Sequence, residues 1–273
     1  MKTQKIDRDH IKDRIDRYRA ENPPNVKTKF KMLKVLHISD THNQHRSLKN
    51  LPVADVIVHS GDFCYAGTEE EAFDFINWFC DLPYKHKIFI AGNHDDCLYG
   101  ADAIEGLDEN CHYLCNSEVV IEGVKFYGLP FFMEDALTNE HTKQITRIPK
   151  DTDVLIPHNP PYRICDFANG IHYGDVKLRN APLQNGSIAF HLFGHIHDAV
   201  GAESIDGVEF SAMVRALMRT IIYTIENLKY WRWNYQINID LYDANRMSMV
   251  QSPTLNPNRS LDPNVKNSCY CVD

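Results

Sequence analysis

Several apolar stretches of the sequence end on side chains that could bind a metal ion or transfer a proton. The first, "LKVLHIS", ends on Asp40-Thr41-His42. If the strand continued, its period of two would place Asp40 and His42 on the same side. A carboxylate and an imidazole aimed at one point suggest a metal ion. On its own, however, D-x-H often arises by chance, and an aspartate that caps the strand end is the simpler interpretation.

Four further apolar runs end in the same way, at "VIVHSGD", "KIFIAGNHD", "DVLIPH" and "FHLFGHIH". Their terminal residues are Asp62, Asn93, His94, His158, His195 and His197. Each histidine alone could be a buried or paired structural residue. Five strand ends of this kind together favour ligands that converge beyond the carboxyl edge of an α/β sheet. We expect the neighbouring glycines, which lack Cβ, to allow close approach of the backbone to the metal.

The elements that must position these residues alternate between strand and helix up to residue 115. Strands are predicted at "MLKVLHIS", "ADVIVHSGD" and "KIFIAGNHD", with a helix at "TEEEAFDFINWFCDL". Thr68 and Glu71 form a capping box at the start of this helix. One helical face is expected to be buried and contains Ala72, Phe73, Ile76, Phe79 and Cys80. The alternation predicts parallel strands joined by right-handed crossovers.

Beyond Cys115 the pattern changes to short strands, which predicts a second, partly antiparallel sheet. A hairpin is expected in "SEVVIEGVKFYGLPF", and further strands at "DVLIPH", "AFHLFGHIH" and "AESIDGVEFSAMV". Two sheets with helices outside them give a layered α/β sandwich. We predict three parts: a helical appendage with a proline-containing linker (1–31), a central domain (32–214) and a divergent extension (215–273) whose last ~20 residues are disordered.

Composition narrows the class of protein. The chain has 273 residues and a formal net charge of −8, which argues against general binding of nucleic acids or anionic membranes, although a small nucleotide could still be a substrate. The first 25 residues lack the apolar core of a signal peptide, and no apolar run is long enough to span a membrane. We therefore expect a cytoplasmic protein whose eight cysteines are reduced thiols.

The order D-x-H, G-D, G-N-H-D, H and G-H-x-H resembles the calcineurin-like metallophosphoesterases over roughly residues 33 to 214. The resemblance implies a four-layer α-β-β-α double β-sandwich and a site with two metals. By position, it implies that the first metal is bound by Asp40, His42 and His197, the second by Asn93, His158 and His195, and both by Asp62. His94 resembles the histidine that faces the leaving group.

The charges of this ligand set suit phosphoester hydrolysis. Two divalent ions bring +4, and the carboxylates of Asp40 and Asp62 return only −2, so a phosphate is attracted. A water between the ions would become hydroxide near neutral pH and attack phosphorus in line, while His94 protonates the departing oxygen. Mixed nitrogen and oxygen ligands favour Mn²⁺, Fe, Zn²⁺, Co²⁺ or Ni²⁺.

One departure from the superfamily narrows the branch. Protein serine/threonine phosphatases carry G-D-x-x-D-R-G, in which the second aspartate orients the catalytic histidine. Here "GDFCYAG" has Tyr65 at that place, so Asp95 or Asp96 becomes the candidate to orient His94. The run up to "IAGNHD", with "HNPPY" and "NSEVVIEGVKFYGLP", is similar to metallophosphoesterase-domain proteins related to class III cyclic-nucleotide phosphodiesterases. Because His195 is present, we expect a complete second metal site.

Other polar residues have simpler interpretations. His45 and Arg46 could touch substrate, but an exposed polar loop is the favoured account. His37 and His59 lie within strands and are expected to be structural. No residue is assigned to substrate binding.

The leading hypothesis is a dinuclear metal-dependent phosphodiesterase that hydrolyses small phosphodiesters such as cyclic nucleotides through a metal-bridging hydroxide. A phosphomonoesterase or nuclease of the same superfamily is the second hypothesis. A weakly active metal-binding scaffold is the third, and the retention of every expected ligand argues against it. Protein partners and oligomeric state are not encoded in any feature we recognise.

Overall fold

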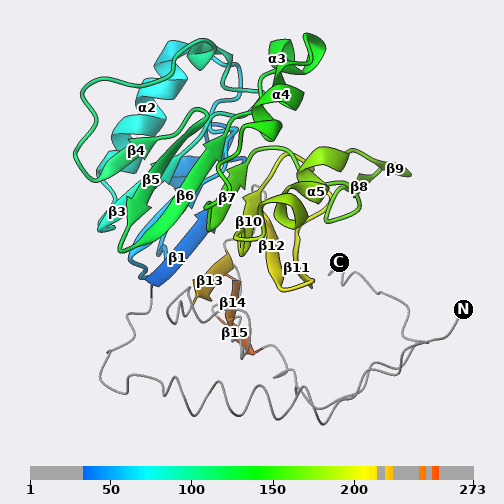
Figure 1. The fold of residues 1–273 in the computed structure, drawn as a ribbon. Helices are drawn as coiled ribbons and strands as arrows, with labels where there is room; N and C mark the ends of the chain where they lie inside the picture. The colour runs from blue at the N-terminus through cyan, green and yellow to red at the C-terminus, as the bar shows by residue number, and fades with distance from the viewer. Residues whose placement is uncertain (1–32, 214–218, 224–239, 244–247, 252–273) are drawn as a thin grey trace, which may run out of the picture.

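A computed structural model describes residues 33–213, 219–223, 240–243 and 248–251. Two β-sheets pack face to face, and helices cover their outer faces (Figure 1). The predicted α-β-β-α arrangement is therefore confirmed. None of the described helices has the length and apolar character that a membrane crossing requires.

The first sheet has the strand order β13-β1-β2-β3-β4. Strands β1 (Leu33–Ile38), β2 (Val56–His59), β3 (His86–Phe89) and β4 (Cys111–Tyr113) are parallel, as the alternation predicts. Strand β13 (Arg219–Tyr223) runs antiparallel along β1. The first described segment of the C-terminal extension thus continues this sheet.

The second sheet has the order β11-β12-β10-β7-β6-β5. Its four central strands, β12 (Val208–Ala212), β10 (Phe190–Phe193), β7 (Val154–Pro157) and β6 (Val124–Leu129), are parallel. Strands β11 (Gly201–Ile205) and β5 (Ser117–Ile121) add one antiparallel hairpin at each edge. The predicted mixed sheet and the hairpin around Glu122-Gly123 are both confirmed.

The core between the sheets follows from the alternation of side chains. Leu33 and Val35 of β1 share one buried cluster with strand residues of the second sheet, such as Phe126 and Val154. Leu36 and Ile38 belong to the cluster beneath the outer helix. A strand buried on both faces is mostly apolar and lacks a regular alternation of polar and apolar residues, which is the pattern of "LKVLHI".

Helix α2 (Glu69–Cys80) covers the first sheet and begins at Thr68, whose Oγ1 accepts the N–H of Glu71, as predicted. The predicted buried face is partly wrong. Phe73 is 63% exposed, and Phe75 is fully buried in its place. Phe75 stacks on Phe63 of the loop after β2, with 4.2 Å between ring centroids, and lies 5.8 Å from the ring of Phe89 in β3. Contacts with the sheet and its loops therefore decide which apolar face is buried.

Helices α3 (Met133–Leu137), α4 (Glu140–Thr146) and α5 (Val176–Asn185) were not predicted. Residues of α4 and α5 cover the second sheet through a cluster that includes Ile145, Leu155 and Leu178. The remaining elements are short: η1 (His45–Ser47), η2 (Asp96–Leu98), β8 (Phe167–Ala168), β9 (Ile171–His172), β14 (Asp240–Asp243) and β15 (Ser248–Gln251). The predicted appendage 1–31 and the last 22 residues (252–273), which include the predicted disordered tail, lie outside the described residues.

Candidate metal centre

The metal-capable residues lie on loops that follow five strands and meet at one edge of the two sheets. Asp40 and His42 follow β1, Asp62 follows β2, and Asn93 and His94 follow β3. The second sheet supplies His158 after β7, and His195 and His197 after β10. All seven predicted ligands and His94 therefore come from the carboxyl ends of parallel strands, as expected for an α/β site.

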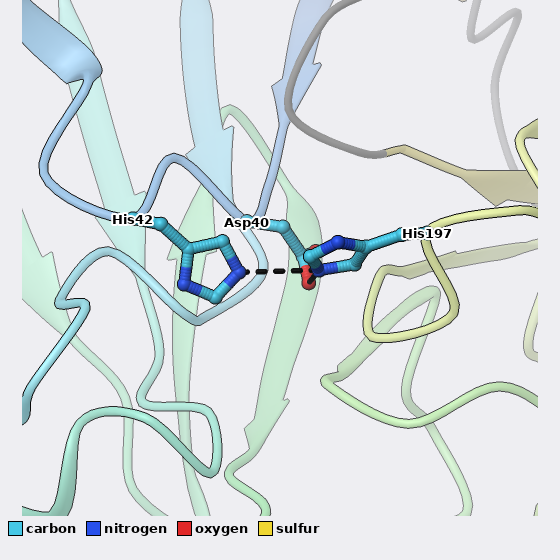
Figure 2. A group of neighbouring side chains, drawn as sticks. All are labelled: Asp40, His42 and His197. Atoms are coloured by element: carbon cyan, nitrogen blue, oxygen red, sulfur yellow. Dashed lines mark hydrogen bonds and ion pairs between the residues drawn. The ribbon is translucent and has the colours of Figure 1, made fainter.

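Asp40, His42 and His197 form a first group of donors (Figure 2). The Nε2 atoms of His42 and His197 are 3.1 Å apart, and Nε2 of His197 is 3.4 Å from Oδ1 of Asp40. Asp40 and His42 are almost fully buried, whereas the His197 side chain is 46% exposed. This group is thus accessible from the side of His197.

Asp62, His158 and His195 form a second group. Oδ2 of Asp62 is 3.3 Å from Nε2 of His158 and 3.9 Å from Nε2 of His42. Oδ1 of Asn93 is 3.2 Å from Nε2 of His158. Asp62 therefore stands between the two groups, where the resemblance expects a shared ligand.

The spacing of these donors fits divalent metal ions. Ligands about 2.1 Å from an ion are separated by about 3.0 Å in octahedral and about 3.4 Å in tetrahedral geometry. The separations of 3.1, 3.2, 3.3 and 3.4 Å among the donor atoms match this range. Carboxylate, amide and imidazole donors together suit a borderline or hard transition metal ion.

Backbone carbonyls fix two of the imidazoles in the tautomer that a metal requires. Nδ1 of His42 donates to the carbonyl of Cys64 at 3.0 Å, and Nδ1 of His158 donates to the carbonyl of Ser60 at 2.8 Å. Each bond places the hydrogen on Nδ1 and leaves a lone pair on Nε2, the atom that faces the other donors.

Electrostatics couple Asp62 to His158. Burial is the largest single influence and would raise the pKa of Asp62, but the charge and hydrogen bond of His158, the N–H of His94 and the charge of His42 together hold the pKa below its ordinary value. Burial is likewise the largest influence on His158 and acts to lower its pKa, but the charge and hydrogen bond of Asp62, together with Asp40 and the carbonyl of Ser60, raise the pKa to about 9. A divalent ion here competes with that proton, so metal binding releases protons.

Two other imidazoles are held neutral. Burial lowers the pKa of His42, and it lowers the pKa of His195 to about 4, with the neighbouring His158 adding to the effect. A neutral imidazole is the form that binds a metal.

The turns after the strands, and not strand alternation, bring Asp40 and His42 together. Strand β1 ends at Ile38, and the backbone of both residues is left-handed, with φ of 52° and 40°. The Asp40 N–H donates to the carbonyl of Gly61, and the His42 N–H donates to that of Asp62. The predicted cause was therefore wrong, although the two side chains do enter one group of donors.

The glycines beside the ligands make room for the ligand side chains. A Cβ at Gly61 would lie 2.6 Å from Nδ1 of His158, and one at Gly194 would overlap the carboxylate of Asp40. These close contacts explain glycine at both places. We expected these glycines to let the backbone approach a metal, but the space beside them is occupied by the side chains of the proposed ligands.

The expected orienter of His94 was wrong. Nδ1 of His94 donates to the backbone carbonyl of Tyr65 at 2.8 Å. Asp95 instead accepts N–H bonds from Asp62, Cys64 and Gly92 at 2.7–2.8 Å, and burial, followed by the charge of Asp62, raises its pKa to about 7. Sequence reasoning missed these contacts, because the backbone carbonyl that accepts from His94 and the backbone N–H groups that donate to Asp95 have no side-chain signature.

The remaining candidate residues lie away from the donors. His45 is buried, not exposed as expected, and its Nε2 lies 3.0 Å from Asp74 of α2, which also binds Arg46. His37 bonds to Ser60 and Ser211, which supports its structural interpretation. His59 likewise bonds to Thr41.

Comparisons with known proteins agree with this geometry. The family model of the calcineurin-like phosphoesterases matches residues 33–199. A UPF0046 protein of Caenorhabditis elegans is 34% identical, over 60% of this chain and 68% of its own length. Metallophosphoesterase domain-containing protein 1 of Homo sapiens is 31% identical, over 68% of this chain and 66% of its own length.

A solved structure supports the fold. The crystal structure of TT1561 of Thermus thermophilus aligns with a TM-score of 0.51 and 13% identity, over 74% of this chain and 97% of that chain. At this identity the likeness concerns the arrangement of the sheets and helices alone.

Proposed function

Because the chain belongs to the calcineurin-like phosphoesterase family and is therefore a metallophosphoesterase, we propose that it uses two divalent metal ions to hydrolyse phosphodiesters, with cyclic nucleotides as the first candidates. The observation that carries the proposal is the pair of donor groups that meet at Asp62. A single ion would leave one of these groups of closely spaced donors without a partner.

In this proposal the first ion is held by Asp40, His42 and His197, the second by Asn93, His158 and His195, and Asp62 contacts both. When bound, the ions supply positive charge for the phosphate and make a nucleophilic hydroxide available near neutral pH. Manganese and the other divalent transition ions all suit this mixture of donors.

The residues of the chain have distinct tasks in this reaction. The carboxylates of Asp40 and Asp62 hold the ligand loops through the N–H groups of His195 and His94, at 3.0 and 2.8 Å. His94 faces the ring of His42 with 4.7 Å between ring centroids. With Nδ1 of His94 bonded to Tyr65, Nε2 is the atom that transfers a proton to the departing oxygen.

The scarcity of arginine near the ligands favours diesters. A monoester carries nearly two negative charges at neutral pH, and sites specialised for monoesters often add arginine to hold the second charge. The ligand loops contain Arg46 and Arg163. Arg46 is paired with Asp74 at 2.7 Å, and the guanidinium of Arg163 lies over the ring of Tyr162. Charge recognition is therefore left to the metals.

Metal analysis tests the dinuclear centre. We expect two ions per chain at saturation with Mn²⁺. Asp62→Asn is expected to weaken both sites, whereas His195→Ala mainly empties the second. Reproducible saturation of the unaltered protein at one ion would refute the dinuclear proposal.

A substrate comparison tests the reaction class. In Mn²⁺, we expect a higher kcat/KM for bis-p-nitrophenyl phosphate than for p-nitrophenyl phosphate, and turnover of 2′,3′- or 3′,5′-cyclic nucleotides. A monoester preference with inert cyclic nucleotides would replace the proposal with a phosphomonoesterase. Full metal loading with no turnover of any ester would favour the scaffold.

A further inference from the structure

Glu71, the third residue of α2, connects the two loops that follow β1 and β2. Its Oε2 accepts the backbone N–H groups of Tyr65, Ala66 and Gly67 at 3.1, 2.8 and 3.0 Å. Its Oε1 accepts a bond from Nδ2 of Asn43 at 2.5 Å. Three consecutive N–H groups on one carboxylate oxygen fix the path of the loop after Asp62.

One of these bonds sets the direction of the carbonyl that holds His94. The carbonyl of Tyr65 and the N–H of Ala66 belong to the same peptide unit, which is planar and trans, so the two groups point in opposite directions. The N–H is 2.8 Å from Oε2 of Glu71, and the carbonyl is 2.8 Å from Nδ1 of His94. Rotation of this peptide breaks both bonds together.

We propose that Glu71 is a positioning residue for His94, acting through the peptide between Tyr65 and Ala66. His94 is held by the backbone carbonyl of Tyr65 and not by a side-chain acceptor, although Tyr65 occupies the sequence position at which the serine/threonine phosphatases carry an aspartate. The link keeps a hydrogen on Nδ1 of His94, which makes Nδ1–H the tautomer of the neutral ring, and it directs Nε2 to the leaving group. The proton that is transferred is the one that Nε2 carries when both ring nitrogens are protonated. This inference rests on the proposed function, because it assumes that His94 serves the departing oxygen.

The alternative is that Glu71 only stabilises the first turn of α2 and has no effect on His94. Thr68 also caps this helix, because its Oγ1 accepts the N–H of Glu71 at 3.3 Å. Thr68→Ala is therefore a matched control: it removes a helix cap, which costs about 1 kcal/mol, but leaves the bonds between Glu71 and the loop in place. Glu71→Gln keeps an acceptor oxygen and serves as the conservative variant.

Kinetics on aryl phosphodiesters of graded leaving-group pKa, at full metal loading, form the first test. We expect Glu71→Ala to lower kcat about 10- to 100-fold for poor leaving groups and much less for good ones. Glu71→Gln should recover part of the loss, and Thr68→Ala should show none. Because Glu71 acts through His94, adding Glu71→Ala to His94→Ala should cause no further loss.

The ¹⁵N signals of the His94 ring form the second test and do not depend on activity. We expect the Nδ1–H tautomer in the unaltered protein and in Thr68→Ala, and a mixture of tautomers in Glu71→Ala. An unchanged tautomer in Glu71→Ala would overturn the inference. So would a loss of kcat in Glu71→Ala that is equal for all leaving groups and is also seen in Thr68→Ala. If His94→Ala itself showed no leaving-group dependence, the proposed role of His94 would fail, and the ¹⁵N signals would still decide whether Glu71 holds the ring.

Discussion

Replacing Gly92 with alanine tests the packing of the proposed centre. Gly92 lies in the loop after β3, next to Asn93. A Cβ at this place would overlap Oδ1 of Asp62 and lie 2.6 Å from the Asp62 nitrogen and 2.7 Å from Cε1 of His158. The φ of Gly92 is not positive, so alanine fits its backbone and the effect is steric.

The loops cannot easily move apart to relieve this overlap. The N–H groups of Gly92 and Asp62 donate to the same oxygen of Asp95, at 2.7 and 2.8 Å. Added methyl groups in packed interiors typically destabilise by about 1–3 kcal/mol. If this destabilisation applies to the arrangement that binds metal, the affinity for the metal ions falls about 5- to 150-fold, at about 1.4 kcal/mol per tenfold change. Both ions should be affected, because Asp62 is shared.

Calorimetric titration of metal-free Gly92→Ala with Mn²⁺ measures this loss. Gly201→Ala is the control, because the added Cβ also makes a close contact, 3.1 Å from Sγ of Cys165, but lies on β11 away from the ligands. We expect the control to bind both ions normally. If Gly92→Ala bound both ions with the affinity of the unaltered protein, the packing of Asp62 and His158 around this glycine would be refuted.

Three other perturbations test the reaction, the core and the metals separately. His94→Ala should keep both metals and lose turnover by about 10²- to 10⁴-fold; an unchanged rate would remove His94 from the reaction. Burial lowers the pKa of His191 from 6.5 to about 3. Below about pH 6.5 the unfolded chain therefore binds a proton that the folded chain does not bind, and the free energy of unfolding decreases as the pH is lowered. The loss of stability between pH 8 and pH 5 should therefore be about 2 kcal/mol smaller in His191→Phe than in the unaltered protein. Urea unfolding at both pH values measures this loss, and an equal loss in the two proteins would contradict the prediction. Chelation of the two metals, each present at about 100 times its Kd, should lower Tm by about 11–22 °C, and an unchanged melting curve would contradict metal binding to the folded state.

The strands of the ligand-bearing sheets could be predicted because their patterns are strong. β1, β2, β3, β7 and β10 lie in segments rich in apolar residues that are followed by metal-capable side chains, and such segments are typical of buried strands. Helix α5 was missed because half of its residues are polar and it contains Pro182. Its start did carry a signal, since Asp175 accepts the N–H groups of Lys177 and Leu178 as a capping residue does.

The local geometry of the site could not be predicted in the same way. The left-handed backbone of Asp40, His42, Asp62 and His195 opposes the intrinsic preference of these residues at a cost of roughly 1 kcal/mol or more each. Bonds between distant loops impose it, such as the N–H of Asp40 on the carbonyl of Gly61. Such contacts depend on the assembled fold and leave no trace in the spacing of residue types.

The ligand loops come from both sheets, and this has a consequence for folding. Each proposed ion joins donors from different sheets, and His42 and His197 are 155 positions apart in the chain. Such an ion acts as a reversible cross-link, and a permanent one of that span would remove unfolded-state entropy worth about 5 kcal/mol. With metal bound, the carboxyl ends of the two sheets should exchange their amide hydrogens as one unit, and without metal as two. Metal supply would then govern how cooperatively the two sheets unfold.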